Sequence, residues 1–281
     1  MQTRFIPAYD TEKAGDCLRA CRRIVEAHQR FNVPATFFIV GKRLEDEGSE
    51  YRSLLGDCPL FEIASHTYSH RILREHPWGP PAVGGAERIR ELTLGKDTVE
   101  QVFGRPCLGI RPGYSFVDGL HGDPELVDAV ASAGLRYVSS TAWGPDYSLP
   151  APLAGPTTYE AEGHPDLWEL PAHGWHDNVL KGYTFADGPR RLILWPMSFP
   201  GAIPIGPIQT PDEEFAINRQ FIDGAVTLGL SYVSLIWHPW SLGRFDSSMR
   251  MLALTFQYVR DIGMDFATYA DEWSRRVGAG G

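Results

Sequence analysis

Short apolar runs and amphipathic stretches alternate along roughly the first half of the chain. Runs rich in β-branched and aromatic residues predict strands, and between them apolar residues recur every three or four positions, which predicts helices. The strands are expected at Phe5–Ala8, Thr36–Val40, Phe61–Ala64, Leu108–Ile110 and Tyr137–Ser139, and the helices at Asp16–Arg30, Ala86–Phe103 and Pro124–Ala133. This alternation is typical of parallel strands joined by crossover helices.

The pattern changes at Trp143 and stays irregular to Thr210. Pro and Gly are frequent there, and only Leu167–Leu170 and Leu192–Trp195 are candidate strands. We interpret this segment, at about 143–210, as a long loop-rich insertion rather than a second core. Alternation then resumes through Glu213–Leu228, Tyr232–Trp237, Ser247–Ile262 and Met264–Tyr269, followed by a short acidic-to-basic tail.

Composition narrows the class of protein. The chain has 281 residues, 43% of them hydrophobic, which is enough for one large α/β domain spanning 1–281. The formal net charge of −9 argues against a nucleic-acid or anionic-membrane partner, because polyanions need clustered Lys and Arg. The first residues lack the features of a secretory signal, and no apolar run could span a bilayer, so we expect a cytoplasmic protein. The four cysteines, Cys17, Cys21, Cys58 and Cys107, are few enough to fit a reducing compartment.

The most specific local motif is the pair His66 and His70, which follows the predicted strand Phe61–Ala64. Two imidazoles four residues apart can point at one place from a single turn, which is a spacing found in metal sites. The plainer alternative is a pair of surface or capping histidines, because short motifs over-match. A third ligand is needed to decide between them.

Asp10 and Glu12 supply two carboxylates at the end of the first predicted strand. In parallel α/β folds the carboxyl ends of the strands share one rim, so either acid could join the two histidines. Two His and one carboxylate leave a coordination position open, which suits zinc or a similar divalent ion. The alternative is that these acids cap the helix predicted at Asp16–Arg30.

Two further polar fragments follow predicted strands. Arg111 begins Arg-Pro-Gly-Tyr after Leu108–Ile110, and His238 follows Tyr232–Trp237. Taken singly, Arg111 could form a surface ion pair and His238 could be a satisfied core histidine. Four polar strand ends at one rim are harder to explain in that way.

These fragments, in this order, resemble the polysaccharide deacetylase (NodB-homology) family over nearly the whole chain. The resemblance rests on Ala35–Gly41, on Glu62–His70, on Arg111–Tyr114 and on Trp237-His238-Pro239. It implies a distorted, incomplete parallel (β/α) barrel of about seven strands. It also implies one divalent metal ion, with Zn²⁺ as the expected ion, held by Glu12, His66 and His70.

The same resemblance implies the catalytic roles. Asp10 would be the general base, Arg111 would tether it, and His238 would be the general acid. The backbone N–H near Tyr114 would help to stabilise an oxyanion. We assign Tyr114 and Trp168 as substrate-binding candidates, although for each aromatic residue of the loop region taken singly a place in an apolar core is the favoured interpretation. Those residues are Trp143, Tyr147, Tyr159, Trp168, Trp175, Tyr183 and Phe185.

The chain departs from the common family pattern at two points. Thr11 separates Asp10 from Glu12, as in a subgroup whose first motif reads Asp-x-Asp or Asp-x-Glu and which is similar to peptidoglycan-deacetylase-like and allantoinase-like proteins. Val138 stands where related chains often carry Asp, so another acid must orient His238. Asp146, Asp177 and Asp246 are the candidates, and the sequence does not choose among them.

The leading functional prediction is a metal-dependent hydrolase that removes N-acetyl groups from an amino sugar or saccharide. The runner-up is a ring-opening hydrolase of cyclic amides or ureides on the same scaffold. A third interpretation is a catalytically inactive carbohydrate-binding protein. The residues that would carry out catalysis argue against it, because all five are present: Asp10, His66, His70, Arg111 and His238. The expected partner is a small-molecule or saccharide substrate, with no nucleic acid and no membrane, and assembly into a homo-oligomer is left open.

Overall fold

The computed structural model describes residues 2–183 and 200–279. The predicted strand Leu192–Trp195 and the aromatic residue Phe185 lie outside these residues. The strands are β1 (Arg4–Thr11), β2 (Ala35–Ile39), β3 (Phe61–Ser65), β4 (Gly109–Ile110), β5 (Tyr137–Val138), β6 (Thr157–Tyr159), β7 (His164–Glu169), β8 (Tyr232–Trp237) and β9 (Asp265–Phe266).

These strands form one nine-stranded sheet in the order β6-β7-β5-β4-β3-β2-β1-β8, with β9 pairing beside β1. All the pairs are parallel except β6 with β7. Seven parallel strands from β7 to β8 therefore make the main sheet, which confirms the predicted distorted, incomplete barrel. The barrel is incomplete because β7 and β8, the two end strands of that run, do not pair with each other.

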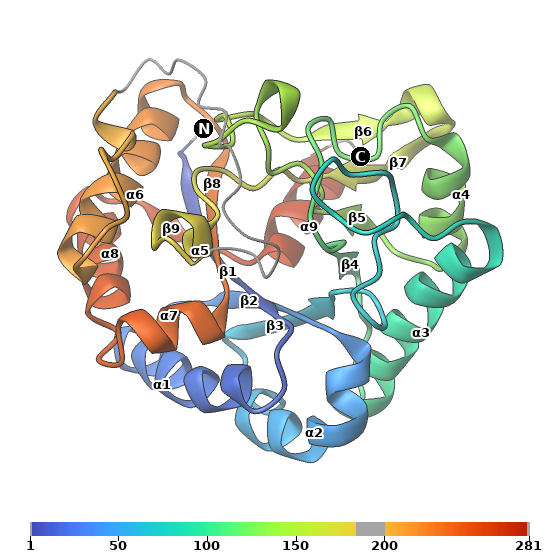
Figure 1. The fold of residues 1–281 in the computed structure, drawn as a ribbon, viewed down its shortest axis with the longest axis horizontal. Coiled ribbons are helices and arrows are strands. Elements are labelled where there is room, and N and C mark those ends of the chain that lie inside the picture. Colours follow the sequence, from blue (N-terminus) through green and yellow to red (C-terminus); the bar gives the residue numbers. More distant parts are fainter. Residues whose placement is uncertain (1, 184–199, 280–281) are drawn as a thin grey trace.

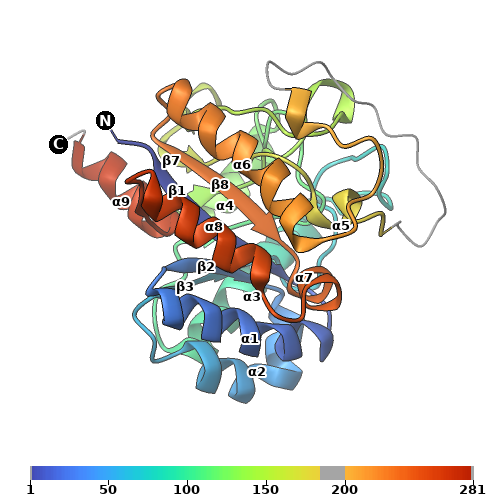
Figure 2. The same cartoon turned by 90° about the vertical axis from the view of Figure 1, so that its left-hand side faces the viewer.

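Helices surround the sheet (Figure 1), and Figure 2 shows α1, α8 and α6 lying along its outside. The α-helices are α1 (Asp16–Phe31), α2 (Gly41–Leu55), α3 (Gly85–Phe103), α4 (Pro124–Ser132), α5 (Asp177–Leu180), α6 (Pro211–Thr227), α7 (Pro239–Phe245), α8 (Arg250–Asp261) and α9 (Tyr269–Ala279). Short 3-10 turns lie at Pro145–Tyr147, Glu160–Glu162 and Pro200–Ala202.

The predicted elements are confirmed in type, with ends shifted by a few residues. The strand at Tyr232–Trp237 matches its prediction residue for residue. At α4, Asp123 caps the helix by accepting from Leu126 N, Pro124 occupies the first turn, and Gly134 follows the helix with φ +79°. The sequence prediction missed α2, the short α5 and α7, and α9, which it took for a tail.

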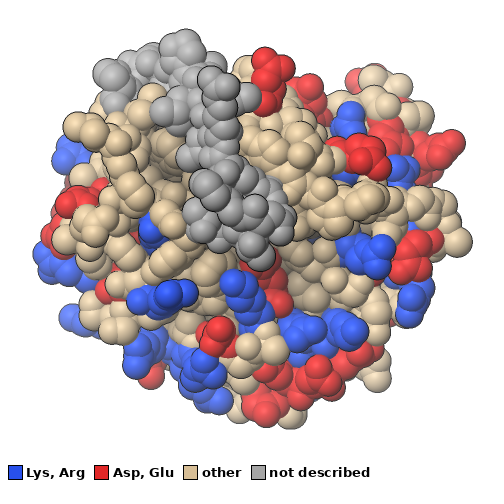
Figure 3. Space-filling view, in the orientation of Figure 1, with Lys and Arg blue, Asp and Glu red and all other residues tan. Residues whose placement is uncertain are grey.

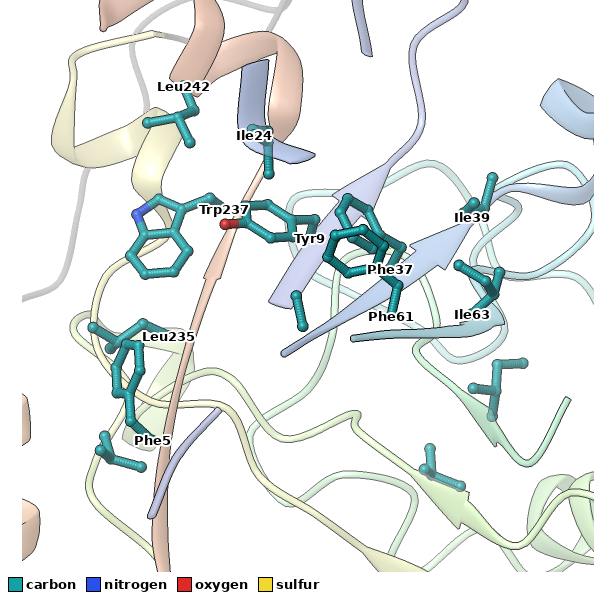
Figure 4. Close-up of a cluster of buried hydrophobic side chains, with 14 of the residues drawn as sticks. Phe5, Tyr9, Ile24, Phe37, Ile39, Phe61, Ile63, Leu235, Trp237 and Leu242 are labelled. Carbon is teal, nitrogen blue, oxygen red and sulfur yellow. The ribbon is translucent and has the colours of Figure 1, made fainter. Parts of the chain in front are cut away.

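Side chains alternate along each strand between the outside and the inside of the barrel. On β1, Phe5 and Tyr9 face the surrounding helices, whereas Ile6 and Ala8 face inward. Figure 4 shows part of the outer cluster, in which Phe5, Tyr9, Phe37, Phe61 and Trp237 pack against Ile24 of α1 and Leu242 of α7. Burying these large apolar surfaces is the main force that holds the helices to the sheet.

The inner face is closed at one end by aromatic residues and becomes polar at the other. Tyr137, Tyr232 and Tyr269 share the small inner cluster. On the same inward face, one pleat repeat beyond Ala8, lies Asp10. The interior is thus packed with side chains toward the amino ends of the strands, and polar side chains such as Asp10 lie at the carboxyl ends.

The surface carries both signs of charge. On the face seen in Figure 3, Lys and Arg side chains are interspersed with Asp and Glu around the periphery. Across the described ranges, none of the helices is both long and apolar enough to cross a membrane.

Candidate active site and metal centre

The carboxyl ends of β1, β3, β4 and β8 surround a cavity of about 400 Å³. It is lined by the sequence-predicted residues Asp10, Glu12, His66, His70, Arg111, Tyr114 and His238. The register explains this meeting, because β1 pairs with both β2 and β8, and β3 pairs with β4. Residues more than 220 positions apart in the chain therefore line one opening.

Glu12, His66 and His70 form a group in which one ligand atom of each lies within 4.8 Å of the others. Nδ1 of His66 lies 2.7 Å from the carbonyl oxygen of Arg111. A neutral imidazole that donates from Nδ1 keeps a lone pair on Nε2, which is the form that binds a metal. Two imidazoles and one carboxylate are a donor set that fits a divalent cation with an open position.

Trp240 holds the carboxylate of Glu12. Its indole Nε1 donates to Oε1 of Glu12 at 2.9 Å, while Oε2 lies 3.2 Å from Nε2 of His70. The ammonium of Lys13 in turn lies 3.2 Å from the centre of the Trp240 ring. One oxygen of Glu12 is therefore fixed by the protein, and the other faces the histidines.

Two helices hold the segment between the histidines. Gly41 N and Lys42 N of α2 donate to the carbonyls of Thr67 and Tyr68, at 2.9 and 2.7 Å. From the other side, Glu91 of α3 accepts from Ser69 N through its carboxylate at 2.8 Å. Thr67 and His70 adopt positive φ of 62° and 63°, which non-glycine residues rarely do, so the fold imposes this turn.

Asp10 and Arg111 form a buried ion pair. Arg111 Nε donates to Asp10 Oδ2 at 2.9 Å, and both side chains are about 5% exposed. Nη1 of Arg111 donates to the carbonyl of Ser139 at 3.0 Å. Oδ1 of Asp10 is buried and has no hydrogen-bond partner within the described chain. Arg111 is thus a tether that leaves one oxygen of Asp10 available inside the site.

Asp177 is the acid that contacts His238. Its Oδ1 lies 2.6 Å from Nδ1 of His238 and also accepts from the His238 backbone N–H at 3.2 Å. The other two candidates are elsewhere: Asp246 accepts from Ser248 and from Met251 N, and Asp146 is exposed on a 3-10 turn. Nδ1 of His238 is therefore engaged, and its Nε2 is the nitrogen left for chemistry.

Residues 13–138 match the family model for polysaccharide deacetylase. Over this segment, which is somewhat less than half of the chain, the protein is similar to polysaccharide deacetylases. The matched segment contains His66, His70 and Arg111, whereas Asp10, Glu12 and His238 lie beyond its ends. The predicted resemblance to this family and the predicted class, a hydrolase of the polysaccharide deacetylase type, are confirmed. No curated protein sequence matched the chain.

Solved structures share the fold at low sequence identity. A Mycobacterium smegmatis protein assigned as a polysaccharide deacetylase has 20% identity and a TM-score of 0.64, with 98% of this chain and 91% of that chain covered. An allantoinase has 12% identity and a TM-score of 0.65, with coverages of 97% and 88%. A family 4 carbohydrate esterase from Streptomyces lividans, solved with acetate, has 12% identity and a TM-score of 0.53, with coverages of 95% and 92%.

Charge in this site is set by burial and by neighbouring groups. Burial disfavours the charged form of Asp10, but Arg111 and the nearby histidines outweigh it and lower the pKa of Asp10. The pKa of Glu12 is also lowered, because the histidines outweigh its burial. Burial lowers the pKa of His66 to about 4, so its ring is neutral near pH 7. These are the protonation states that metal ligands require.

His238 has the opposite tendency. Burial alone would lower its pKa, but the carboxylates of Glu12, Asp177 and Asp10 together raise it to about 9. The imidazole is therefore protonated near neutral pH, as a general acid must be before it donates.

The two predicted substrate-binding residues lie in different places. Tyr114 lines the cavity, with φ +70°, and its carbonyl accepts from Trp143 Nε1 at 2.7 Å. Trp168 does not line it: its ring lies 5.3 Å from the guanidinium of Arg276, which also reaches Ser231 at the amino end of β8. Among the other loop aromatics, Trp143, Tyr159 and Trp175 are buried, as the core interpretation predicted.

Several cavity residues were missed at the sequence level. His176 lines the cavity next to Trp143, with ring centres 4.3 Å apart, and donates from Nε2 to Ala142 O at 2.8 Å. Burial lowers its pKa to about 4, so it is neutral. The dipeptide His176-Asp177 in a loop of low regularity was the available signal. Trp240, which also lines the cavity, was not among the predicted site residues.

Proposed function

We propose that the protein is a divalent-metal-dependent deacetylase that hydrolyses the N-acetyl group of an amino sugar or saccharide. The observation that carries this proposal is the Glu12, His66 and His70 cluster in one cavity with a tethered carboxylate, Asp10, and an imidazole, His238, that is held by Asp177. An amide hydrolase needs a base for water and an acid for the leaving nitrogen, and the cavity offers both.

Glu12, His66 and His70 would hold the metal ion, and Zn²⁺ fits this donor set best. The neutral ring of His66 and the carboxylate of Glu12, which Trp240 holds by one oxygen so that the other faces His70, support this assignment. When bound, a divalent ion would polarise the substrate carbonyl as a Lewis acid and favour ionisation of water beside it.

The protein's own groups carry the protons. Oδ1 of Asp10 would accept a proton from the water that attacks the carbonyl carbon, while Arg111 keeps Asp10 in place. The backbone N–H of Tyr114 would help to stabilise the oxyanion. His238 would then protonate the amide nitrogen as the C–N bond breaks, which releases acetate and an amine. Acid and base steps of this kind each contribute on the order of 10²–10⁴ in rate.

Metal content is the first test. Inductively coupled plasma analysis of protein purified without chelator should give about one zinc per chain, by the usual stoichiometry of such sites. His66→Ala and His70→Ala should lose metal and activity together while circular dichroism stays unchanged. Asp10→Asn and His238→Ala should keep the metal and lose kcat by roughly 10²-fold or more. Full metal occupancy in either histidine variant would reject the ligand assignment.

A substrate panel separates deacetylation from ring opening. The zinc-loaded protein should release acetate from N-acetylglucosamine oligomers and leave allantoin and other cyclic ureides intact. The opposite result would favour the ring-opening alternative, which uses the same scaffold.

A further inference from the structure

Behind His238 the described chain contains a buried line of ionisable groups. Oδ1 of Asp177 contacts the imidazole, and Oδ2 of the same carboxylate accepts from Lys181 Nζ at 2.8 Å. The ammonium also lies 3.0 Å from Oε1 of Glu214. The order of contacts is therefore imidazole, carboxylate, ammonium, carboxyl group.

We propose that Lys181 and Glu214 are positioning residues that hold Asp177 against His238 and thereby fix the imidazole for proton donation. This inference rests on the proposed role of His238 as the general acid. Neither residue lines the cavity, so neither touches the substrate.

The two contacts of Asp177 fix the plane of its carboxylate. His238 holds one oxygen through two N–H groups, and Lys181 holds the other. Without Lys181, Oδ2 would have no partner among those observed, and the carboxylate could rotate away from Nδ1. The ammonium thus acts on the imidazole through the rigid carboxylate between them.

Glu214 adds a second hold on the same segment. Its Oε1 accepts from the indole Nε1 of Trp237 at 3.1 Å, and Trp237 directly precedes His238. Burial raises the pKa of Glu214 to about 7, although Lys181 opposes the shift. Lys181 is thus the counter-charge on which an ionised Glu214 depends, and the pair anchors α5 and α6 to the end of β8.

Stability alone does not explain this arrangement. The side chains of Lys181 and Glu214 are fully buried. Removing two charges from water is costly, and buried ion pairs are often replaceable by apolar residues without loss of stability. A role in placing the imidazole gives a reason to keep them.

The test compares Lys181→Met with a matched control, Lys96→Met. Lys96 forms a similar pair with a carboxylate four residues later, Glu100, at 2.7 Å, but on α3 and away from the cavity. Two substrates are used with zinc-loaded protein: an N-acetylglucosamine oligomer, and p-nitrophenyl acetate, whose leaving group needs no general acid.

In Lys181→Met, kcat for the amide should fall by about tenfold or more while kcat for the ester changes by less than about threefold. The pH values at which kcat for the amide declines on the acidic and alkaline sides should also change. KM and zinc content should stay the same. Lys96→Met should match the wild type on both substrates. An equal fall on both substrates, or no fall, would overturn the proposal.

Nuclear magnetic resonance gives a reading that does not depend on the substrate. The Nδ1 proton of His238 should appear far downfield in the wild type and in Lys96→Met, and should shift or broaden in Lys181→Met. An unchanged resonance in Lys181→Met would overturn the positioning role of Lys181, whether or not the protein turns over an N-acetyl substrate. A changed resonance in a protein that turns over no N-acetyl substrate would count against the proposed deacetylase function and not against the positioning role. If Lys181→Met does not fold, Glu214→Gln, which is isosteric, takes its place in both measurements with the same expected direction.

Discussion

At the scale of single residues, Glu12 has different partners for its two oxygens. Oε1 is fixed by Trp240, and Oε2 faces His70. We expect Glu12→Gln to weaken zinc binding strongly, because it removes the anionic ligand, and Glu12→Asp to retain part of the affinity.

Trp240→Phe keeps the ligand and removes its orienting bond, so it should lower zinc affinity by roughly 10- to 100-fold. Competition with a fluorescent chelator measures all three. Wild-type affinity in Trp240→Phe would show that Glu12 needs no such support.

Gly113 offers a second test of the metal site. A methyl group at this position would lie 2.8 Å from Nε2 and 3.0 Å from Cε1 of His70. Gly113→Ala should therefore displace the imidazole and reduce zinc affinity, with little change in thermal stability because the site is at the rim. Gly84→Ala is the matched control, since nothing lies within 4 Å of its added methyl. Equal zinc affinity in the two variants would argue against His70 as a ligand.

The site residues that were predicted share one property. Asp10, His66, Arg111 and His238 each stand just at or beyond the end of an apolar strand, so strand prediction places them at one rim. Asp177 was undetermined because it acts from a loop 61 residues before its partner. Local patterns carry no information about which loop folds over a strand end, and three aspartates were therefore equivalent in the sequence.

At the scale of elements, two of the missed helices, α2 and α9, escaped prediction for different reasons. The buried residues of α2 are Gly41, Leu44, Gly48, Tyr51 and Leu55, so only three large side chains mark its inner face within a charged segment. The start of α9 did carry a signal: Thr268 Oγ1 accepts from Asp271 N at 3.1 Å, and Asp271 Oδ2 accepts from Thr268 N at 2.8 Å. This reciprocal pair is a capping box with Asp in place of Glu.

The contact between α3 and the histidine segment gives a prediction for Gly95. An added Cβ would lie 2.7 Å from the backbone carbon of Thr67 and 2.9 Å from Tyr68 N. Alanine in a helix interior normally stabilises by about 0.5–1 kcal/mol over glycine, but here the backbone must move, so Gly95→Ala should destabilise by about 1–3 kcal/mol. Urea unfolding measures the change, and zinc affinity should fall with it.

The control for Gly95 is another helical glycine, Gly278 of α9. Nothing lies within 4 Å of its added methyl group, so Gly278→Ala should be neutral or slightly stabilising. If Gly95→Ala were as stable as Gly278→Ala, the close approach of α3 to the segment between His66 and His70 would not be needed.

At the scale of the whole molecule, the sequence predicted the alternating architecture but not how the barrel ends meet. β7 and β8 do not pair as strands; instead His173 N donates to Ser234 O at 2.9 Å, and His173 Nδ1 accepts from Ser234 N at 3.0 Å. Tyr232 OH adds a bond to Pro171 O at 2.8 Å. A side chain that completes a backbone ladder leaves no periodic signal, so this closure could not be predicted.

Buried histidines, His173 among them, make the stability of the fold depend on pH. Burial lowers the pKa of His28, His173 and His176 to about 4, against about 6.5 in an unfolded chain. Between these values the unfolded state binds protons that the folded state does not, so the free energy of unfolding should fall as pH drops from 7 toward 4. Glu214, whose pKa burial raises to about 7, acts in the opposite direction over that range, and so does Glu62, whose pKa burial also raises.

His28→Gln isolates one of these contributions. His28 donates to Val33 O and bonds to Tyr9 OH deep in the core, so the variant will be less stable at pH 7. Its further loss between pH 7 and 4.5 should nevertheless be smaller than that of the wild type, by an amount on the order of 2–3 kcal/mol if the full shift is expressed. Urea unfolding of the zinc-free protein at pH 7, 5.5 and 4.5 measures the two slopes. Parallel slopes would mean that the ring of His28 accepts a proton in the folded core as readily as in the unfolded chain, and that acid sensitivity arises elsewhere.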